Sequence, residues 1–457
     1  MTARLSQARL AALPPAIARP TYDRDRSDHT LVHLGPGAFH RAHQAVFTED
    51  ARLAGGGEWT IVGVSLRHGE AQATLRPQDG LYSVEFLAEP PSLRVVGAVG
   101  EVLTAPAEPA PVLAALVAPS TAIVSLTVTE AGYCLDGEGR LDVAHPDIQQ
   151  DLAGRTRSAP GWIVRGLAER RRTGAGPLTV ISCDNLIGNG ARLEGAVLAL
   201  ADRIDPTLAA WITANAAFPG TMVDCIVPAS DPGQRRRAAA ALGMSDMASV
   251  QREGFAQWAI EDRFAGPRPA WERAGVEIVP DVAGHERLKL HVLNLAHSAL
   301  AYRGLPRGID FVRQAIADPE LARVADALIA EEIAPALPDL PVGAYWRNVR
   351  ARLANPRLDH RLKQIAEDGS VKLAQRAFPL IIDSARAGRP ASRLAAVVSA
   401  WLDCARRDLV RDAKGERLAA WRAAGASLAE ALDDPLLFPE PFRREPSVRS
   451  LILDAPA

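Results

Sequence analysis

The amino-acid sequence predicts an α/β protein: a first domain with a mainly parallel sheet, residues 1–282, and then a mostly α-helical domain, residues 283–457. Short runs rich in β-branched residues alternate with helix-like stretches in the first part of the chain. This alternation is typical of parallel strands joined by crossover helices. After about residue 283, strand-like runs become scarce and Ala-, Leu- and Arg-rich segments dominate. A pair of glycines directly follows the first predicted strand.

Each element of the first domain is identified by its residue types. Residues 1–28 are polar and contain proline, which indicates a lead-in arm. Runs of four to seven apolar, β-branched residues then predict strands, because such side chains fit the buried face of a sheet. The predicted strands are Leu31–Leu34, Ile61–Val64, Ala122–Val128 and Leu178–Ser182.

The second domain is predicted to be helical. Segments such as Leu321–Ala334 and Ser392–Arg407 consist of good helix formers, and proline and glycine separate them. The segment Glu286–Tyr302 is predicted to be one α-helix. At ~100° per residue, with Lys289 at zero, His297 lies at about 80°, Asn294 at about 140° and Glu286 at about 60°. Four polar groups would therefore share one side of an otherwise apolar helix.

Bulk composition excludes several function classes. The formal charge is −2, with 48% hydrophobic and 23% charged residues, which argues against nucleic acid or an anionic membrane as the main partner. The four cysteines are far apart, so neither a disulfide framework nor a metal site is predicted. The N-terminus has no long apolar stretch after its first arginine, and a cytoplasmic protein is expected. The sequence leaves the oligomeric state open.

The glycine pair predicts a dinucleotide-binding loop. It lies in Gly35-Pro36-Gly37-Ala38-Phe39, at the spacing of the Rossmann fingerprint, and His40 occupies the place of the third glycine. Glycine permits a tight turn and a close backbone approach to a pyrophosphate. No acidic residue stands at the end of the second strand. Arg67 follows it and is a candidate for a 2′-phosphate, so NAD and NADP both remain open.

Lysine is rare in this chain, with only Lys289, Lys363, Lys372 and Lys414 among its 52 basic residues. Lysine, unlike arginine, loses its proton when it is buried and can then act as a base. Lys289 stands in an apolar run, where we expect a base that accepts the proton of a secondary alcohol. Asn294, and Asn185 after the fourth strand, can donate hydrogen bonds to the developing alkoxide. An incidental polar stripe on a surface helix is the alternative.

Seven segments together resemble the mannitol dehydrogenase family of long-chain, metal-independent polyol dehydrogenases. They occur in order over roughly residues 19–400, and within the family they are most similar to the branch that reduces keto-uronates. The segments are 33–45, 125–133, Ser182-Cys183-Asp184-Asn185, 218–224, 257–262, 289–298 and 364–372.

The resemblance implies a Rossmann-type domain, an α-helical domain and a site between them. It implies that Lys289 is the general acid/base, that Asn185 and Asn294 form the oxyanion hole and that His297 orients the substrate. Positions implied to line or contact the substrate are Asp224, Glu130, Glu286 and Lys372.

Arg376 favours a sugar acid as substrate. It lies four residues after Lys372, and its guanidinium fork suits a carboxylate, which a neutral polyol lacks. An Arg that points to solvent is the alternative. The resemblance to the keto-uronate branch, supported by Arg376, implies the reaction of D-fructuronate with NADH to give D-mannonate and NAD, with no metal. Mannitol or arabinitol dehydrogenase activity, and a nucleotide-sensing protein without turnover, remain as alternatives. The sequence departs from the family pattern at three places: Cys225, His291 and Leu295-Ala296.

Overall fold

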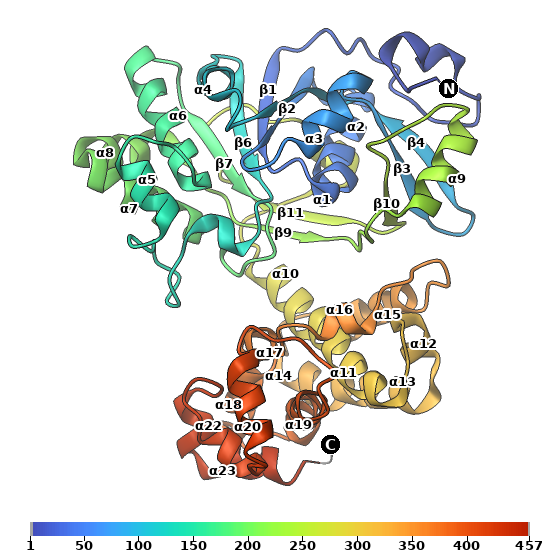
Figure 1. Ribbon diagram of the computed structural model, residues 1–457, viewed down its shortest axis with the longest axis vertical. Coiled ribbons are helices and arrows are strands. Elements are labelled where there is room, and N and C mark those ends of the chain that lie inside the picture. Colours follow the sequence, from blue (N-terminus) through green and yellow to red (C-terminus); the bar gives the residue numbers. More distant parts are fainter. Residues whose placement is uncertain (1–2, 456–457) are drawn as a thin grey trace. The chain divides into compact units, whose positions relative to one another are not determined.

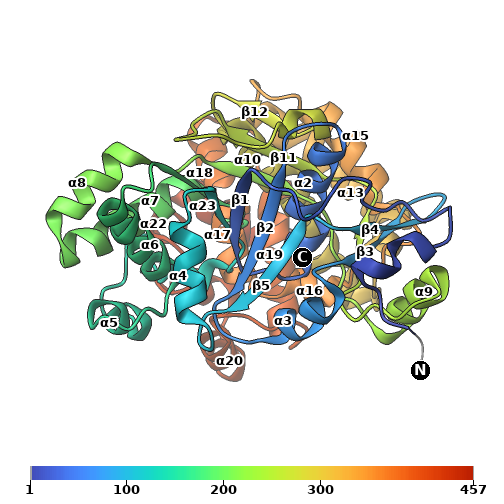
Figure 2. The same cartoon turned by 90° about the horizontal axis from the view of Figure 1, so that it is seen from above.

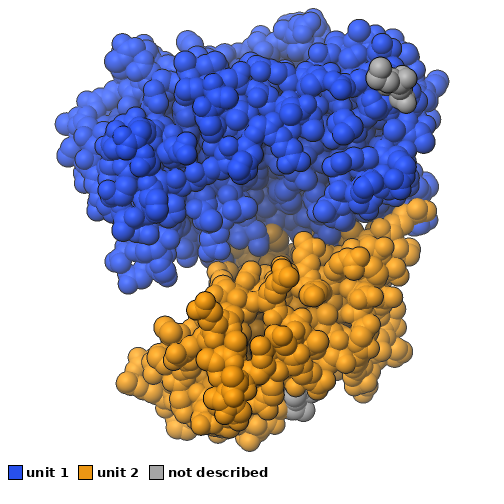
Figure 3. All heavy atoms as spheres, viewed as in Figure 1, with its two compact units in different colours: residues 1–283 blue, residues 284–457 orange. Residues whose placement is uncertain are grey.

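The computed structural model describes residues 3–455. The chain divides into two compact units, and the boundary falls after Ala283 (Figure 3). Unit 1 ends at that residue, and unit 2 begins at Gly284. Among the residues described, no helix has both the length and the apolar character that crossing a membrane requires.

Unit 1 is built around a parallel sheet. In the described part of the chain it has six strands in the order β5-β2-β1-β6-β7-β8, and each neighbouring pair is parallel. Figure 2 shows β1, β2 and β5 side by side. The α/β fold with a parallel sheet is confirmed, and four of these strands (β1, β2, β6 and β7) lie where the sequence predicts them. The bounds are β1 His29–Leu34, β2 Trp59–Ser65, β5 Val99–Thr104, β6 Thr121–Leu126, β7 Leu178–Ser182 and β8 Ala216–Ala217.

Helices cover both faces of this sheet, because alternate residues of each strand point to opposite faces. Val32 and Leu34 of β1 pack in one apolar core with residues of α4, α6 and α7, and Leu31 packs in a second core with residues of α2. The helices of unit 1 are α1 Ala38–Ala42, α2 Gln44–Leu53, α3 Glu70–Leu75, α4 Pro109–Val117, α5 Pro146–Leu152, α6 Ala159–Thr173, α7 Asn189–Ile204, α8 Pro206–Asn215 and α9 Pro232–Leu242.

Two small sheets complete unit 1 (Figure 1). Their strand orders are β10-β3-β4 and β12-β11-β9. The sequence analysis did not predict these strands. Their bounds are β3 Tyr82–Leu87, β4 Ser92–Val96, β9 Thr221–Asp224, β10 Val250–Glu253, β11 Gln257–Glu261 and β12 Glu277–Val279.

The strand order defines where a ligand is expected. Strand β1 pairs with β2 on one side and with β6 on the other, so the chain crosses over in opposite directions from β1. In open parallel sheets, ligands bind beyond the carboxyl ends of the strands at such a switch point. The residues that follow β1, β2 and β6 therefore surround the expected nucleotide site.

Unit 2 is helical throughout its regular structure, as predicted (Figure 1). Its core includes Leu300, Trp401 and Phe378, which are almost fully buried. The α-helices are α10 Ala283–Leu288, α11 Leu295–Gly304, α12 Val312–Ala317, α13 Pro319–Ala327, α14 Ala334–Ala336, α15 Val342–Leu353, α16 Leu362–Ala366, α17 Gly369–Arg376, α18 Phe378–Arg386, α19 Ser392–Arg406, α20 Gly415–Ala423, α21 Leu428–Leu432, α22 Glu440–Arg444 and α23 Pro446–Leu453.

One structural prediction for unit 2 is wrong. The segment Glu286–Tyr302 is not a single α-helix, because a π-helical turn, Lys289–Asn294, separates α10 from α11. A π-helix closes hydrogen bonds from residue i to residue i+5; such turns are rare and are frequently found at functional sites. Unit 2 contains a second one, Leu328–Ile333, between α13 and α14. Lys289 and Asn294 are five residues apart, so the π geometry brings them one turn apart on the same face. An ordinary α-helix would leave them about 140° apart.

Candidate active site

The loop after β1 has the shape that a dinucleotide requires. Gly35 has φ +89°, and a Cβ there would lie 2.3 Å from the carbonyl oxygen of Thr127. The Thr127 hydroxyl also donates to the Gly35 carbonyl at 2.8 Å. Gly37 is exposed, and a Cβ on it would meet only the Gly35 oxygen, at 3.8 Å. Ala38 and Phe39 begin α1 behind it. The loop is thus held tightly on the protein side and open on the other, which fits a pyrophosphate.

His40, in the place of the third fingerprint glycine, packs α1 onto the sheet. Its ring stacks on that of His33 with a centroid separation of 3.4 Å, and both residues are fully buried. The two ring nitrogens of His33 are hydrogen-bonded to the hydroxyls of Ser125, at 2.7 Å, and Thr127, at 2.9 Å. Burial lowers the pKa of His33 to about 3, so the stack is uncharged near neutral pH. The stacked rings therefore hold α1 against β1, a helix–strand contact that a glycine makes possible in the usual fingerprint.

Arg67, the predicted cofactor residue after β2, is engaged by a carboxylate. Both of its terminal nitrogens donate to Asp147 at the start of α5, and one of these bonds measures 3.2 Å. This hydrogen bonding lowers the pKa of Asp147. The pair joins the segment after β2 to the segment after β6. The role of Arg67 in binding a nucleotide remains a prediction.

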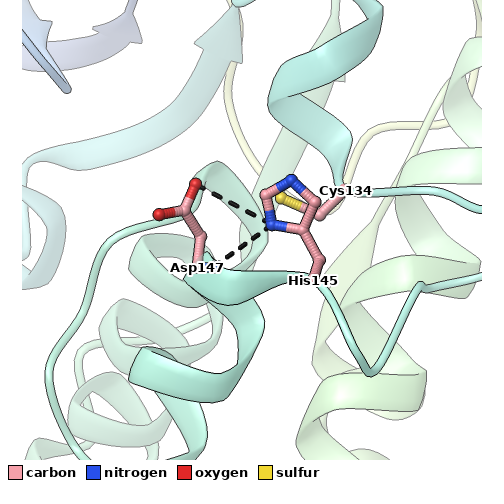
Figure 4. A group of neighbouring side chains, drawn as sticks. All are labelled: Cys134, His145 and Asp147. Carbon is pink, nitrogen blue, oxygen red and sulfur yellow. Dashed lines mark hydrogen bonds and ion pairs between the residues drawn. The ribbon is translucent and has the colours of Figure 1, made fainter.

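A cysteine, a histidine and an aspartate gather at this same place. Ligand atoms of Cys134, His145 and Asp147 lie within 4.8 Å of one another (Figure 4). Each has a structural reason to be there. Arg67 binds the carboxylate, His145 Nδ1 accepts the backbone N–H of Asp147 at 3.2 Å, and burial raises the pKa of the Cys134 thiol to about 12. We therefore assign no metal role to this group.

The loop after β7 carries Asn185, the predicted second amide. Asn185 is exposed, and the preceding Asp184 is half-buried. The Asp184 carboxylate accepts the backbone N–H groups of Val128, at 3.0 Å, and Thr129, at 2.9 Å. It thereby fixes the loop after β6, on which Glu130 lies exposed. Asp184 belongs to a motif that the sequence analysis quoted, but its anchoring role was missed, since only the tertiary structure brings the two loops together.

Asp224 lies at the end of β9 and is only 3% exposed. Asn189 ties this strand to the loop of Asn185. Its side-chain nitrogen donates to the carbonyl oxygens of Asp184, at 3.1 Å, and Thr221, at 3.0 Å. The predicted residues Asn185 and Asp224 thus lie on two segments that one buried amide connects.

In unit 2, the π-helical turn carries two of the predicted catalytic residues. Lys289 is half-buried, and Asn294 is 9% exposed. Glu286 precedes them on α10 and is half-buried. The π turn thus begins at the predicted acid/base residue and ends at the predicted oxyanion-hole residue.

Arg376 holds the end of this turn. Its Nη1 donates to the carbonyl oxygen of Asn294 at 3.0 Å and to the hydroxyl of Ser298 at 2.9 Å. In return, a ring nitrogen of His291 is hydrogen-bonded to the Arg376 carbonyl at 2.9 Å. Burial lowers the pKa of Arg376 to about 10. None of these contacts involves a substrate, so the role of Arg376 as a carboxylate fork remains a prediction.

His297 lies against a second histidine, His360, which the sequence analysis did not select. The two rings meet edge to face, 5.4 Å apart. Lys372 is close enough to lower the pKa of His360, and its own ammonium donates to the carbonyl of Ile365 at 3.2 Å. His360 follows a loop without an obvious motif, so no local pattern pointed to it.

The charged groups that act on the two imidazoles are basic. Desolvation first, and then the neighbouring His360, Arg376, Arg352 and Lys372, lower the pKa of His297. Desolvation and Lys372 lower the pKa of His360 to about 4. Near neutral pH both imidazoles are therefore uncharged, and they lie beside the basic side chains of Lys372 and Arg376. Such a surrounding favours a bound anion.

The chain matches two family models in succession. Residues 29–273 match the mannitol dehydrogenase Rossmann domain, and residues 281–424 match the mannitol dehydrogenase C-terminal domain. The protein is a member of the mannitol dehydrogenase family. It is thus an enzyme of a family of NAD-dependent polyol dehydrogenases, as the resemblance implied.

Relatives within the family differ in substrate. The chain is 43% identical to an uncharacterised oxidoreductase of Escherichia coli, YeiQ, over 80% of this chain and 76% of that one. It is 42% identical to the D-mannonate oxidoreductase of the same organism, over 84% and 82% of the two chains. A solved structure of Pseudomonas fluorescens mannitol 2-dehydrogenase, a ternary complex with NAD and D-mannitol, covers 98% of this chain and 95% of its own, with 32% identity and a TM-score of 0.88. These relatives identify a polyol or sugar-acid dehydrogenase.

Proposed function

We propose that the protein reduces a keto-uronate to a sugar acid, with D-fructuronate and D-mannonate as the substrate pair and NADH as reductant. The observation that carries this proposal is the basic surrounding of His297, where Lys372 and Arg376 lie together with His360. A carboxylate compensates such a group of charges, and a neutral polyol cannot. The 42% identity to D-mannonate oxidoreductase supports the same substrate class.

NAD is the proposed cofactor, and it supplies the hydride acceptor or donor. The residues present fit it, because Gly35 needs a backbone conformation that a side chain would block and Gly37 leaves the loop open to the pyrophosphate. The similar mannitol 2-dehydrogenase was solved with NAD. Arg67 faces Asp147 rather than standing alone, which favours NAD over its 2′-phosphorylated form.

Lys289 is the proposed general acid/base. In the reducing direction the protonated amine donates to the carbonyl oxygen of the substrate, and in the reverse direction the neutral amine accepts the proton of the alcohol. Asn294 and Asn185 donate hydrogen bonds to the oxygen as charge develops on it. His297 orients the substrate. Asp224, Glu130 and Glu286 are proposed to line the site.

Substitution of the proposed base tests the mechanism. Lys289→Ala should lower kcat by ~10²- to 10⁴-fold, the usual contribution of a general acid/base, and should leave the Kd for NADH nearly unchanged. Lys363→Ala is a matched control, because Lys363 is exposed on α16 of the same unit. A Lys289→Ala enzyme with a near-normal rate would refute the mechanism.

A substrate panel tests the specificity. Absorbance of the nicotinamide is followed with D-mannonate, D-altronate, D-mannitol and D-arabinitol, each with NAD and with NADP. The proposal requires kcat/KM to be highest for a sugar acid. Preference for D-mannitol, which the P. fluorescens relative binds, would instead make the protein a mannitol dehydrogenase. NADH binding without turnover on any of these would favour a nucleotide sensor.

A further inference from the structure

His360 lies on the segment that connects α15 to α16, and the fold brings it against the predicted substrate residue His297. The neighbouring Arg361 forms an isolated bridge with Phe311, and the backbone N–H of Val312 bonds to the His360 carbonyl at 3.0 Å. These contacts fix the backbone at the His360 carbonyl and at the residue that follows it. The His360 ring is therefore placed by the scaffold of unit 2.

Both imidazoles carry a nitrogen whose hydrogen-bonding capacity is unused. His297 Nε2 and His360 Nδ1 are buried and have no hydrogen-bond partner within residues 3–455. Buried polar atoms in folded proteins are nearly always hydrogen-bonded, and an exception calls for an explanation such as a bound water, an ion or a functional role. His297 is only 7% exposed, so bulk solvent does not satisfy its ring. Two such nitrogens on rings that meet edge to face leave hydrogen-bonding capacity for a polar ligand.

The neighbouring charges define the chemistry of that ligand. The groups that act most strongly on His297, apart from burial, are all basic. Lys372 is half-buried. Arg376 already donates hydrogen bonds from its Nη1 to the Asn294 carbonyl and to the Ser298 hydroxyl. The Lys372 ammonium uses one of its three donors on the Ile365 carbonyl and keeps two for a ligand, while Glu367, Asp368 and Asp412 act to raise its pKa. A neutral hydroxyl would satisfy the imidazoles but would leave the excess of positive charge.

We propose that His360 is a specificity-determining residue that, with Lys372 and His297, receives the carboxylate of the sugar acid. This assignment rests on the proposed function and adds to it the residue that separates sugar acids from polyols. An uncharged imidazole donates a hydrogen bond without the cost of a further cation beside Lys372. The Lys372 ammonium then supplies the positive charge, and the His360 ring orients the substrate carboxylate through a directional hydrogen bond.

His360→Asp tests the assignment directly, because it places a carboxylate where the substrate carboxylate is expected. The expected result is a fall in kcat/KM for D-mannonate of about 10- to 100-fold, the loss of one hydrogen bond to a charged group. The fall should appear mainly in KM. The kcat/KM for D-mannitol should change less than about threefold. The ratio of kcat/KM for D-mannonate to that for D-mannitol therefore tests the role of His360. Lys363→Met, which removes a nearby exposed cation, should leave the ratio unchanged.

A second measurement separates binding from turnover. In a Lys289→Ala background, D-mannonate binding to the protein with saturating NAD is followed by calorimetry, with and without His360→Asn. Weaker binding of D-mannonate in the double variant, with an unchanged thermal midpoint, supports the assignment. Equal losses for D-mannonate and D-mannitol, or no loss for either, would overturn it.

Failure of the proposed function gives a different pattern. If the wild-type enzyme prefers D-mannitol to D-mannonate, the proposed substrate is wrong whatever His360 does. If the wild type prefers D-mannonate and His360→Asp keeps that preference, only the assignment of His360 is wrong.

Discussion

Replacement of Arg376 by methionine removes both the stabilising hydrogen bonds of this buried cation and the free-energy cost of burying its charge. Its Nη1 makes two hydrogen bonds, to the carbonyl oxygen of Asn294 and to the hydroxyl of Ser298. Bonds from a charged donor contribute ~1.5–3 kcal/mol each. Burial lowers the pKa of Arg376 from 12.5 to about 10, and at ~1.4 kcal/mol per pKa step the buried charge costs about 3 kcal/mol. The net stabilisation is therefore about 0–3 kcal/mol.

Arg376→Met should accordingly destabilise unit 2 only modestly, because the carbonyl of Asn294 keeps the Ser298 hydroxyl as a donor at 3.2 Å. The expected fall in thermal midpoint is ~2–4 °C per kcal/mol for a domain of this size. The larger effect should be on kcat, about 10- to 100-fold, because the π turn loses the contact that fixes Asn294 as a donor to the developing alkoxide.

Calorimetric melting and steady-state kinetics measure the two effects together. Arg386→Met on α18 is the control, since that arginine makes an exposed ion pair with Glu445. Arg376→Met and Ser298→Ala should be non-additive, because they remove the same bond. An unchanged kcat with a raised KM confined to sugar acids would refute this reasoning. It would show instead that Arg376 binds the substrate carboxylate, as the sequence analysis predicted.

Three further predictions concern unit 1. Gly35→Ala should weaken NADH binding at least about tenfold, as measured by fluorescence titration. The reason is that residue 35 has φ +89° and an added Cβ would lie 2.3 Å from the Thr127 carbonyl oxygen. Unchanged affinity would contradict the role of the loop in binding the dinucleotide. Asp147→Asn should raise kcat/KM with NADP relative to NAD about tenfold by releasing Arg67 to a 2′-phosphate, and an unchanged ratio would remove Arg67 from the site. Burial holds the pKa of His33 at about 3 in the folded state, below its ordinary 6.5. The unfolded chain therefore binds a proton first, and stability should be fully present above pH ~6.5 and fall by up to ~1.4 kcal/mol per pH step as the pH drops toward 3. Urea unfolding of wild type and His33→Asn at several pH values measures this loss, and equal slopes for both would show that His33 is not its source.

Local pattern was sufficient for much of the fold. Strands β1, β2, β6 and β7 are short apolar runs that are buried on both faces, so their residue types alone reveal them. Strand β5 was missed because the run Val99–Thr104 contains a glycine and a glutamate and is stabilised by its pairing with β2. Strands of the small sheets are likewise defined by partners distant in the chain.

The candidate active site was likewise predicted only in part from local sequence pattern. The scarcity of lysine and the apolar run around Lys289 pointed to that residue, and the resemblance supplied its proposed role. The helical wheel then gave a wrong angle between Lys289 and Asn294, because the segment is a π turn and not part of an α-helix. Sequence spacing carries no information about an inserted residue of this kind.

Taken by itself, the sequence determined the α/β and helical parts and the glycine loop, because these follow from composition and short-range order. The proposed acid/base residues came from the resemblance to the family. Only the tertiary structure decided that Asp184 anchors the loop of Glu130, that Asp147 engages Arg67 and that His360 faces His297. Each of these pairs joins residues more than 50 positions apart. Such contacts arise from how elements pack, and no local period encodes them.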